Sequence, residues 1–209
     1  MFKDRADAGK KLAKKLEKFK NNTDTIVATI PRGGVVTGFE IAKYLNLPLD
    51  VVVTKKIGAP GNPEYAIGSI NRHGDILVDE DAVLITGASQ EYLEEQSKIL
   101  KQKVEEKLKM LKGDKAPTSY KDKIVILVDD GIATGYTALA AAKFLKDEGA
   151  KKVVMAMPVV PADNIDKFKD KVDEFIYLES PVMFASVGQF YQDFTQVEDE
   201  EAKELLAKV

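Results

Sequence analysis

The stretch Ile126-Leu127-Val128-Asp129-Asp130-Gly131-Ile132-Ala133-Thr134-Gly135-Tyr136-Thr137 decides how this chain folds. Its first residues end a largely apolar run, 123–128, which predicts a buried strand. Its last residues lead into a helical pattern over 138–146. Two carboxylates, Asp129 and Asp130, stand where the strand ends. A strand followed by a glycine- and threonine-rich turn and then a helix is the order of a βα unit in a parallel sheet.

The turn between this strand and helix has the chemistry of an anion site. A helix N-terminus offers free backbone N–H groups to a phosphate. Gly131 and Gly135 let the backbone approach an anion without a Cβ clash, and Thr134 and Thr137 add hydroxyl donors. Two nearby carboxylates would repel a bare phosphate, so we expect a ligand that also carries hydroxyls or a cation. The glycine patterns of P-loops and dinucleotide-binding turns are both absent from the sequence.

Composition narrows the class of protein. The 209 residues predict a single domain, 1–209, and the formal net charge of −3 argues against nucleic acid as a partner. The absence of cysteine excludes disulfides and thiolate metal sites, and a single histidine argues against a multi-histidine metal centre. The start, Met1–Arg5, has no signal-peptide core, and no apolar run approaches about 18 residues. We therefore expect a cytoplasmic protein without a membrane span.

Strand and helix patterns alternate along most of the chain. Apolar runs predict strands at 25–30, 49–53, 123–128, 152–157 and 174–178, and helical patterns cover 4–20, 35–45, 89–111, 138–146, 163–169 and 197–208. This alternation predicts an α/β fold, with a parallel sheet flanked by helices on both faces. Polar segments directly follow three of the strands, at 31–34, 54–56 and 129–130. Because ligands bind beyond the carboxyl ends of such strands, we expect these segments to converge on one edge.

Two regions depart from the alternation. Lys55–Pro63 is rich in glycine, proline and lysine, which predicts a basic loop. Two alternating runs, 66–70 and 75–78, flank the polar residues 71–74 and predict a β-hairpin. Near the end of the chain, residues 181–196 are aromatic and predict an irregular segment.

Residues 126–137 fill every defining position of the motif that binds phosphoribosyl diphosphate (PRPP), so the chain resembles the type I phosphoribosyltransferases. An ordinary βα turn with surface aspartates is the alternative, but packing alone does not explain two aspartates followed by Thr-Gly-x-Thr. The likeness extends over nearly the whole chain to a group of small prokaryotic predicted phosphoribosyltransferases. The motifs that carry it lie at 4–9, 31–34, 56–64, 66–68 and 187–196.

The resemblance implies transfer of the 5-phosphoribosyl group from PRPP to a nitrogen acceptor, a nucleobase-like compound, with release of pyrophosphate. It implies that Asp129 and Asp130 hold the ribose hydroxyls and that Arg32 and Lys56 bind the pyrophosphate. The other residues expected to bind substrate are Gly33, Gly34, Lys55, Gly131, Ile132, Ala133, Thr134, Gly135, Tyr136 and Thr137. Mg²⁺ is the implied cofactor, held mainly by ligand and water oxygens, so no set of protein ligands is expected for it. For Arg32 and the two lysines, solvated surface charges are the alternative.

The resemblance also implies two covers over the site. A mobile lid over the pyrophosphate would be Gly58–Asp79, loop plus hairpin, and a hood over the acceptor would be 181–196. Phe184 and Tyr191 of the hood either stack on a planar base or belong to the core. Ala133 stands where 6-oxopurine enzymes of this fold carry an aspartate that exchanges a proton with the base, so another acceptor is implied. The expected partners are PRPP, that small molecule and a second copy of the chain in a homodimer.

Two other functions stay open at the level of sequence. A non-catalytic sensor of PRPP or of a nucleotide would use the same phosphate cradle for regulation. A PRPP-forming diphosphokinase shares the acidic loop, but this chain is short for that two-domain architecture and shows no ATP site. Binding of PRPP without release of pyrophosphate on any acceptor would distinguish the sensor from the transferase.

Overall fold

The computed structural model describes residues 1–115 and 117–209, and its centre is a five-stranded parallel sheet. Its strands stand in the order β2-β1-β6-β7-β8, and every neighbouring pair is parallel. They are β1 (Thr25–Thr29), β2 (Leu49–Val51), β6 (Ile124–Val128), β7 (Lys152–Val159) and β8 (Glu174–Glu179). The predicted parallel sheet is confirmed, and the strand that ends in two aspartates is its middle strand.

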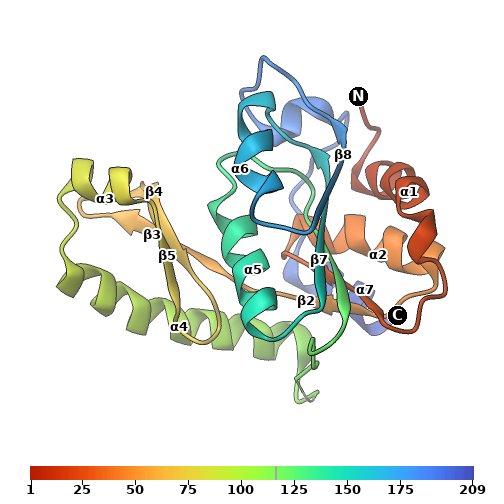
Figure 1. The fold of residues 1–209 in the computed structure, drawn as a ribbon, viewed down its shortest axis with the longest axis horizontal. Helices are drawn as coiled ribbons and strands as arrows, with labels where there is room; N and C mark the ends of the chain where they lie inside the picture. The colour runs from red at the N-terminus through yellow and green to blue at the C-terminus, as the bar shows by residue number, and fades with distance from the viewer. Residues whose placement is uncertain (116) are drawn as a thin grey trace.

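Helices cover both faces of this sheet, as predicted (Figure 1). Helices α1 (Arg5–Lys15) and α2 (Gly33–Leu45) pack on one face, and α5 (Tyr136–Asp147) and α6 (Ile165–Lys169) pack on the other. Helix α7 (Asp199–Ala207) packs with α2 beside the edge strand β2. Short 3₁₀ turns are η1 (Glu17–Phe19), η2 (Ala162–Asn164) and η3 (Val187–Phe190). Within the two described ranges, no helix combines the length and apolar character needed to cross a bilayer.

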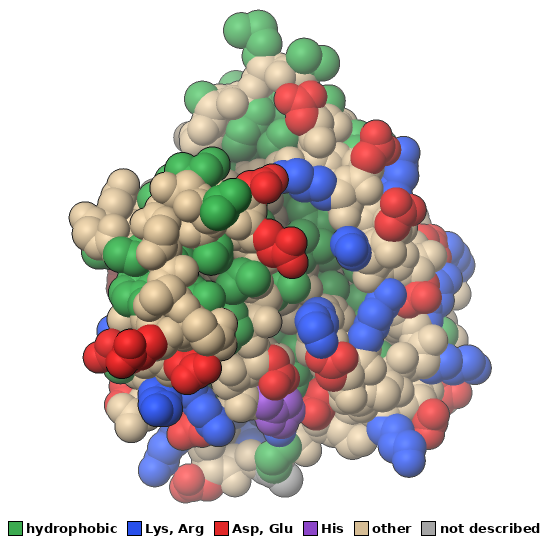
Figure 2. Space-filling view, turned by 60° about the vertical axis from the view of Figure 1, so that its left-hand side comes forward, with side chains coloured by type: hydrophobic (Ala, Val, Ile, Leu, Met, Phe, Trp, Pro, Cys, Tyr) green, Lys and Arg blue, Asp and Glu red, His purple; other side chains and the backbone are tan. Residues whose placement is uncertain are grey.

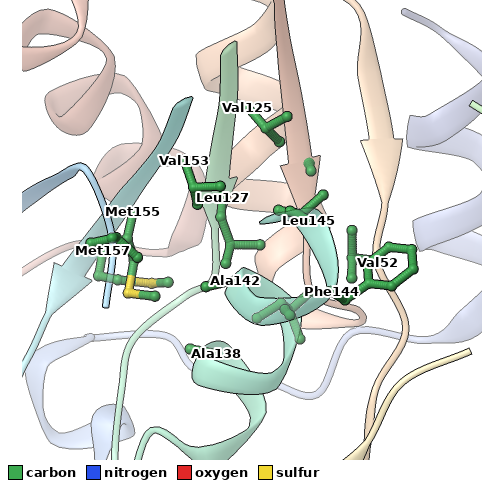
Figure 3. Packing of buried hydrophobic residues seen from close by; sticks show 14 of the residues in the cluster. Val52, Val125, Leu127, Ala138, Ala142, Phe144, Leu145, Val153, Met155 and Met157 are labelled. Carbon is green, nitrogen blue, oxygen red and sulfur yellow. The ribbon is translucent and has the colours of Figure 1, made fainter. Parts of the chain in front are cut away.

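The packing of β6 explains why its sequence is apolar without a break. Val125 and Leu127 belong to the core formed with α5, whereas Ile126 and Val128 belong to the core formed with α1 and α2. Since both faces of the strand are covered, both sets of alternating side chains are buried. Figure 3 shows the α5 side of this core, with Leu127 close to Ala142.

A second sheet, of three antiparallel strands, projects from the parallel one (Figure 1). Its strands are β3 (Lys55–Ala59), β4 (Asn62–Ile70) and β5 (Ile76–Val78), in that order. The predicted hairpin is confirmed as β4 and β5. The predicted basic loop at 55–63 is wrong, because Lys55–Ala59 pairs with β4 as a strand. Ile57 and Ala59 are buried there in a small core shared with α4 (Gln90–Lys112), and this burial favours the strand over the loop.

A short helix, α3 (Glu80–Thr86), follows this sheet and is not predicted by the sequence analysis. It begins where the Asp79 carboxylate accepts the N–H of Ala82 at 3.0 Å, and it ends at Gly87 with a positive φ of 66°. Such a cap satisfies an N–H group that has no partner within the helix. A cap at each end therefore compensates for the short length of α3.

Residues 181–196 fold against the N-terminal segment. The N–H of Phe2 donates to the carbonyl of Phe190 at 2.7 Å, and Phe2 forms an isolated parallel bridge with Tyr191. Phe2 and Tyr191 are buried together with Ala8 of α1 and Val159 at the end of β7. The aromatic segment predicted as irregular is thus packed next to the carboxyl ends of the strands.

Candidate functional site

The loops that follow β1 and β6 touch each other at the carboxyl edge of the parallel sheet. A Cβ built on Gly34 would lie 2.9 Å from both Cα and Oδ1 of Asp129. A Cβ on Gly33 would collide with the carboxylate of Asp130. Glycine is therefore required at both positions by the close approach of the two loops. The structure places 31–34 and 129–130 together, as the sequence predicts, and the peptide bond between Pro31 and Arg32 is cis.

Arg5 of α1 is the third member of this cluster, and the sequence analysis gave it no role. Its Nε donates to Oδ2 of Asp130 at 2.7 Å, and its Nη1 donates to the carbonyl of Thr195 at 2.7 Å. The guanidinium carbon lies 3.8 Å from the centroid of the Phe194 ring. Arg5 is 9% exposed, so the pair with Asp130 is shielded from solvent and holds that carboxylate in one orientation.

The two aspartates strongly influence each other's charge. Burial raises the pKa of Asp129 well above its ordinary value, and the neighbouring charge of Asp130 raises it further. Burial also raises the pKa of Asp130, but the hydrogen bond and charge of Arg5 oppose this rise. The backbone N–H of Asp130 donates to Oδ1 of Asp129 at 2.8 Å. A pair of crowded carboxylates favours a ligand that brings hydroxyl donors or positive charge.

The loop from Gly131 to Gly135 is fixed by contacts with the rest of the protein. The N–H of Ile132 donates to the carbonyl of Val159 at 2.9 Å. A Cβ on Gly131 would lie 2.5 Å from Cγ1 of Val187, and a Cβ on Gly135, whose φ is +85°, would collide with the ring of Phe168. These glycines are therefore required by packing against protein atoms, a reason other than the expected approach of an anion.

Other parts of the same loop face outward. Ala133 and Thr134 are exposed, and the Ala133 carbonyl accepts a hydrogen bond from Nδ2 of Asn164 at 2.5 Å. Helix α5 begins at Tyr136 without a side-chain cap, so the N–H groups of its first turn have no side-chain acceptor at the cap position. The exposed Thr134 hydroxyl and these N–H groups together provide the donors that an anion requires.

The antiparallel sheet is hydrogen-bonded to the start of α5. Ser69 of β4 donates to the carbonyl of Tyr136 at 3.1 Å, and Thr54 donates to the carbonyl of Thr137 at 3.5 Å. The Tyr136 hydroxyl donates to the carboxylate of Asp79. This hydrogen bond lowers the pKa of Asp79, while burial and then Asp79 itself raise the pKa of Tyr136 to about 12. The position of this sheet is thereby coupled to the expected phosphate loop, Gly131–Thr137.

The two lysines of β3 have different surroundings. Side chains alternate along a strand, so Lys55 and Lys56 point to opposite faces. Lys55 is half-buried, and its pKa is lowered by burial first and then by Lys107 and Lys103. Its surroundings also include the charge of Arg32. Lys56 is exposed and pairs with Glu64 at 2.9 Å. Lys56 is thus engaged in a surface ion pair, whereas Lys55 is half-buried among other cationic side chains.

Arg32 extends from the loop at 31–34 toward the start of helix α7. Its Nη1 is 3.8 Å from Oδ1 of Asp199 and 3.9 Å from Oε2 of Glu198. Asp199 also pairs with Lys107 of α4. Arg32 is therefore only partly neutralised, at long distance, and keeps positive charge beside the Gly33–Gly34 backbone. Figure 2 shows the face between the projecting sheet and the main body, where acidic and basic side chains border a hollow.

The two hood residues, Tyr191 and Phe184, differ in how deeply they are buried. Tyr191 is 5% exposed, and its ring centroid lies 5.3 Å from that of Phe2 and 5.0 Å from that of Phe194. Its hydroxyl donates to the backbone carbonyl of Asp130 at 2.5 Å. Tyr191 is therefore a buried support for the acidic loop, which favours the core alternative over a platform for a base. Phe184 is partly exposed and stacks on Phe190, with ring centroids 6.0 Å apart.

Comparison with known proteins identifies the family. Residues 2–194 match the model of the phosphoribosyl transferase domain. The chain belongs to the phosphoribosyl transferase family. A protein of Mycobacterium tuberculosis, named as a candidate phosphoribosyl transferase, is 40% identical to this transferase domain over 204 residues, which cover 96% of this chain and 45% of that protein. The chain thus spans about half the length of the curated relatives that it matches.

Two further proteins show how far the likeness of this phosphoribosyl transferase domain extends. The crystal structure of TT1426 from Thermus thermophilus has a TM-score of 0.84 and 35% identity, and the match covers 100% of this chain and 98% of that one. The uracil phosphoribosyltransferase of Desulfitobacterium hafniense is 35% identical over only 65 residues, 30% of this chain and 31% of that protein. The type I phosphoribosyltransferase-like α/β fold is therefore shared along the whole chain.

The phosphoribosyl transferase family typically uses PRPP together with Mg²⁺. Within 1–115 and 117–209, no group of three or more histidine, cysteine, aspartate or glutamate side chains is arranged to hold a metal ion. The acidic strand end offers Asp129 and Asp130, and Arg5 holds one oxygen of Asp130. Such a donor set fits a cation that arrives with most of its ligands on the substrate and in water.

Proposed function

We propose that this domain transfers the 5-phosphoribosyl group of PRPP to a nitrogen acceptor and releases pyrophosphate. The observation that carries the proposal is the direct contact between the Gly33–Gly34 backbone and the carboxylates of Asp129 and Asp130. It brings a basic loop, an acidic pair and the start of α5 to one sheet edge. PRPP carries a pyrophosphate, two ribose hydroxyls and a 5-phosphate, which are the groups that these three elements suit. Membership of the phosphoribosyl transferase family supports the same reading.

The acidic pair would hold the ribose ring. Arg5 binds one oxygen of Asp130, and the Asp130 N–H binds one oxygen of Asp129. We assign the other oxygen of each carboxylate to the 2- and 3-hydroxyls of the ribose. As the bond from C1 to the pyrophosphate oxygen breaks, positive charge develops on the ribose, and these negative groups stabilise it. The acceptor nitrogen forms the new bond to C1 and loses its proton to solvent, and the electrons of the broken C1–O bond leave with the pyrophosphate.

The two phosphate groups would bind on either side of the ribose. Thr134, Thr137 and the first-turn N–H groups of α5 would hold the 5-phosphate. Arg32, the backbone at Gly33 and Lys55 would hold the pyrophosphate. Lys55 is preferred to Lys56 because it shares its surroundings with Arg32, whereas Lys56 pairs with Glu64. Bound with the pyrophosphate, Mg²⁺ would neutralise part of the charge on the leaving group.

The acceptor is proposed to be a nucleobase-like compound other than a 6-oxopurine. Ala133 offers no carboxylate for proton exchange with the base, and its carbonyl already accepts from Asn164. Phe184 is one of three partly exposed aromatic side chains of the hood, and it is next to the exposed Val182 and Met183. A match of 65 residues, 30% of this chain, to a uracil phosphoribosyltransferase supports such an acceptor.

Calorimetric titration with Mg²⁺ and PRPP tests the binding part of the proposal, and a screen of bases for pyrophosphate release tests the reaction. We expect saturable binding and release with at least one acceptor, and little release with hypoxanthine or guanine. Efficient turnover of guanine would remove the assignment of the acceptor class. Binding of PRPP without release on any base would instead favour a non-catalytic sensor that uses the same cradle.

A further inference from the structure

A cavity of about 270 Å³ lies along the outer edge of strand β2, apart from the proposed PRPP site. Strand β2 and the residues after it form its floor, α4 forms one wall, and the β4–β5 turn with Phe144 forms another. Phe144 lies more than two turns beyond Tyr136 on α5, about 12 Å along the helix at ~1.5 Å per residue. The Phe144 end of the cavity is therefore separated from the phosphate loop by most of the length of that helix, whereas Val53 at its other end adjoins Thr54, which bonds to Thr137.

The inner surface of this cavity is apolar. Val51, Val52, Val53 and Leu108 line it together with Phe144. Val52 and Phe144 lie side by side at one end of the core (Figure 3). An apolar hollow that opens to solvent favours a ligand with apolar surface to bury.

Three cationic side chains stand around the opening. They are Arg72 in the β4–β5 turn, Lys109 in the last turns of α4, and Lys115 just beyond that helix. The guanidinium carbon of Arg72 lies 5.6 Å from the centroid of the Phe144 ring. In the part of the chain that the structure describes, none of the three forms an ion pair with a carboxylate within 4.0 Å. Their positive charge is thus directed to solvent at the mouth of an apolar hollow.

The other charged groups of the cavity do not cancel this charge. Asp50 is 5% exposed, accepts a hydrogen bond from the Tyr120 hydroxyl at 2.7 Å, and forms an ion pair with Lys112, whose Nζ lies 2.6 Å from Oδ1. Asp50 and Lys112 therefore neutralise each other inside the wall. Glu105 is the remaining carboxylate at the opening. Together with the three cations it gives the opening a net charge of +2.

We propose that this cavity is a second ligand site, which binds an organic phosphate with an apolar body, of the nucleoside monophosphate class. A phosphomonoester carries a charge of about −1.5 to −2 at pH 7, which matches the excess positive charge. Arg72 presents paired N–H groups to the phosphate oxygens, and the two lysines act as point charges. The base or sugar of the ligand fills the apolar hollow above Val52 and Leu108.

Bound ligand would join two parts of the fold. Arg72 belongs to the sheet that carries Lys55, whereas Lys109 belongs to the helix behind that sheet. A phosphate held by both would fix the β4–β5 turn against α4. The second site therefore lies where a nucleotide can act on the sheet without entering the PRPP site.

The chain contains a single histidine, His73, and it lies next to this cavity. Its ring centroid is 5.4 Å from that of Phe144, and its Nε2 is 2.8 Å from Oε1 of Glu148, at the end of α5 remote from the phosphate loop. Figure 2 shows this histidine in purple on the face below the projecting sheet. As the chain has no other histidine, the Cε1 proton of His73 should give a single NMR signal that reports on the cavity.

The test is a titration of the His73 signal at constant pH with AMP, GMP and UMP, and separately with adenosine and with pyrophosphate. We expect a saturable shift with at least one nucleotide, and none with adenosine or pyrophosphate at the same concentrations. Lys109→Gln with Lys115→Gln should weaken the apparent Kd at least tenfold, since both side chains are exposed and their loss leaves the fold intact. Lys98→Gln, on the exposed surface of the same helix, is the matched control and should change nothing.

Two results would overturn the proposal. One is the lack of a saturable shift with all three nucleotides, and the other is an unchanged affinity in the double lysine variant. A shift that disappears in Asp129→Asn with Asp130→Asn would also count against it, because it would show that the signal follows the PRPP site. An equal response to pyrophosphate would contradict the apolar part of the ligand.

Discussion

Arg5 and Asp130 lie 125 positions apart in the chain and meet at 2.7 Å, Nε to Oδ2, beneath the proposed ribose site. The side chains of this pair are 10% and 16% exposed, so solvent screens it far less than a surface ion pair. The guanidinium is held in turn by the carbonyl of Thr195 and the ring of Phe194. Arg5 is thus placed to orient Asp130 rather than to touch the substrate itself.

Replacing Arg5 should weaken PRPP binding and change its pH dependence. In Arg5→Gln the charge that holds down the pKa of Asp130 is lost, so that pKa rises further above its ordinary value. The carboxylate is then protonated at higher pH, and the acidic limb of the PRPP-binding profile shifts upward. We expect PRPP affinity to fall by a factor of about 10 to 100, the range of a lost charged hydrogen bond. Lys14→Gln on the same helix is the control, and an unshifted acidic limb in Arg5→Gln would contradict the positioning role.

Asp129→Asn with Asp130→Asn should weaken PRPP binding by about 1–3 kcal/mol while the fold is retained. The two amides fill the same volume but no longer accept the ribose hydroxyls as carboxylates do. Calorimetry with PRPP measures the loss, and circular dichroism checks the fold. Unchanged affinity for PRPP in the double variant would refute the ribose assignment.

The phosphate loop is best tested at Thr134. Thr134→Val removes an exposed hydroxyl without changing the side-chain volume, so it should weaken ribose 5-phosphate and PRPP alike, by about tenfold. Gly135→Val is unsuitable, because its Cβ would enter the ring of the fully buried Phe168 and lower the melting temperature. Normal binding of ribose 5-phosphate to Thr134→Val would show that the hydroxyl does not face the 5-phosphate.

Lys55 and Lys56 give a matched pair for the pyrophosphate site. Lys55→Met should raise the Kd for pyrophosphate at least tenfold, because the half-buried ammonium shares its surroundings with Arg32. Lys56→Met should change that Kd by less than twofold, because Lys56 is already paired with Glu64 at the surface. The reverse order of the two effects would restore Lys56 as the pyrophosphate ligand.

Hydrogen exchange tests whether Gly58–Asp79 is a lid. We expect fast exchange across these residues in the free protein and added protection with Mg²⁺ and PRPP, whereas β6 stays protected in both states. Since the Tyr136 hydroxyl donates to Asp79, Tyr136→Phe should speed the exchange of the free protein further. Equal, strong protection with and without ligand would show instead a static sheet, in which β3 stabilises the hairpin.

The sequence predicted the parts of the fold that depend on local pattern. The unbroken apolar run of β6 requires cover on both faces, so both the parallel sheet and the polar strand ends at its edge could be predicted. Strand β3 could not, because Gly58 and Pro60 favour a loop, and only pairing with β4 and burial of Ile57 reverse that preference. The role of Arg5 could not be predicted either, because its partner Asp130 is remote in the sequence. Within α1, Arg5 is one of several charged residues among apolar positions.

Gly131 and Gly135 show that a sequence motif does not reveal why a residue is required at its position. Gly131 and Gly135 were expected to make room for an anion, but Val187 and Phe168 fill the space that their side chains would take. Glycine fits both explanations, room for an anion and room for a protein side chain. Only the atoms that surround each position distinguish the two. Tyr191 is a comparable case, because its ring is enclosed by Phe2 and Phe194 instead of facing an acceptor.

The bridge between Phe2 and Tyr191, and the bond from Arg5 to Thr195, have a consequence for how the protein is made. The parallel sheet is complete at Glu179, before Tyr191 and Thr195 are synthesised. Until then Arg5 lacks its carbonyl acceptor, and the Asp130 loop lacks the Tyr191 hydroxyl beneath it. A chain that still lacks residues 180–196 therefore has all five strands of the parallel sheet but not these supports for Arg5 and Asp130.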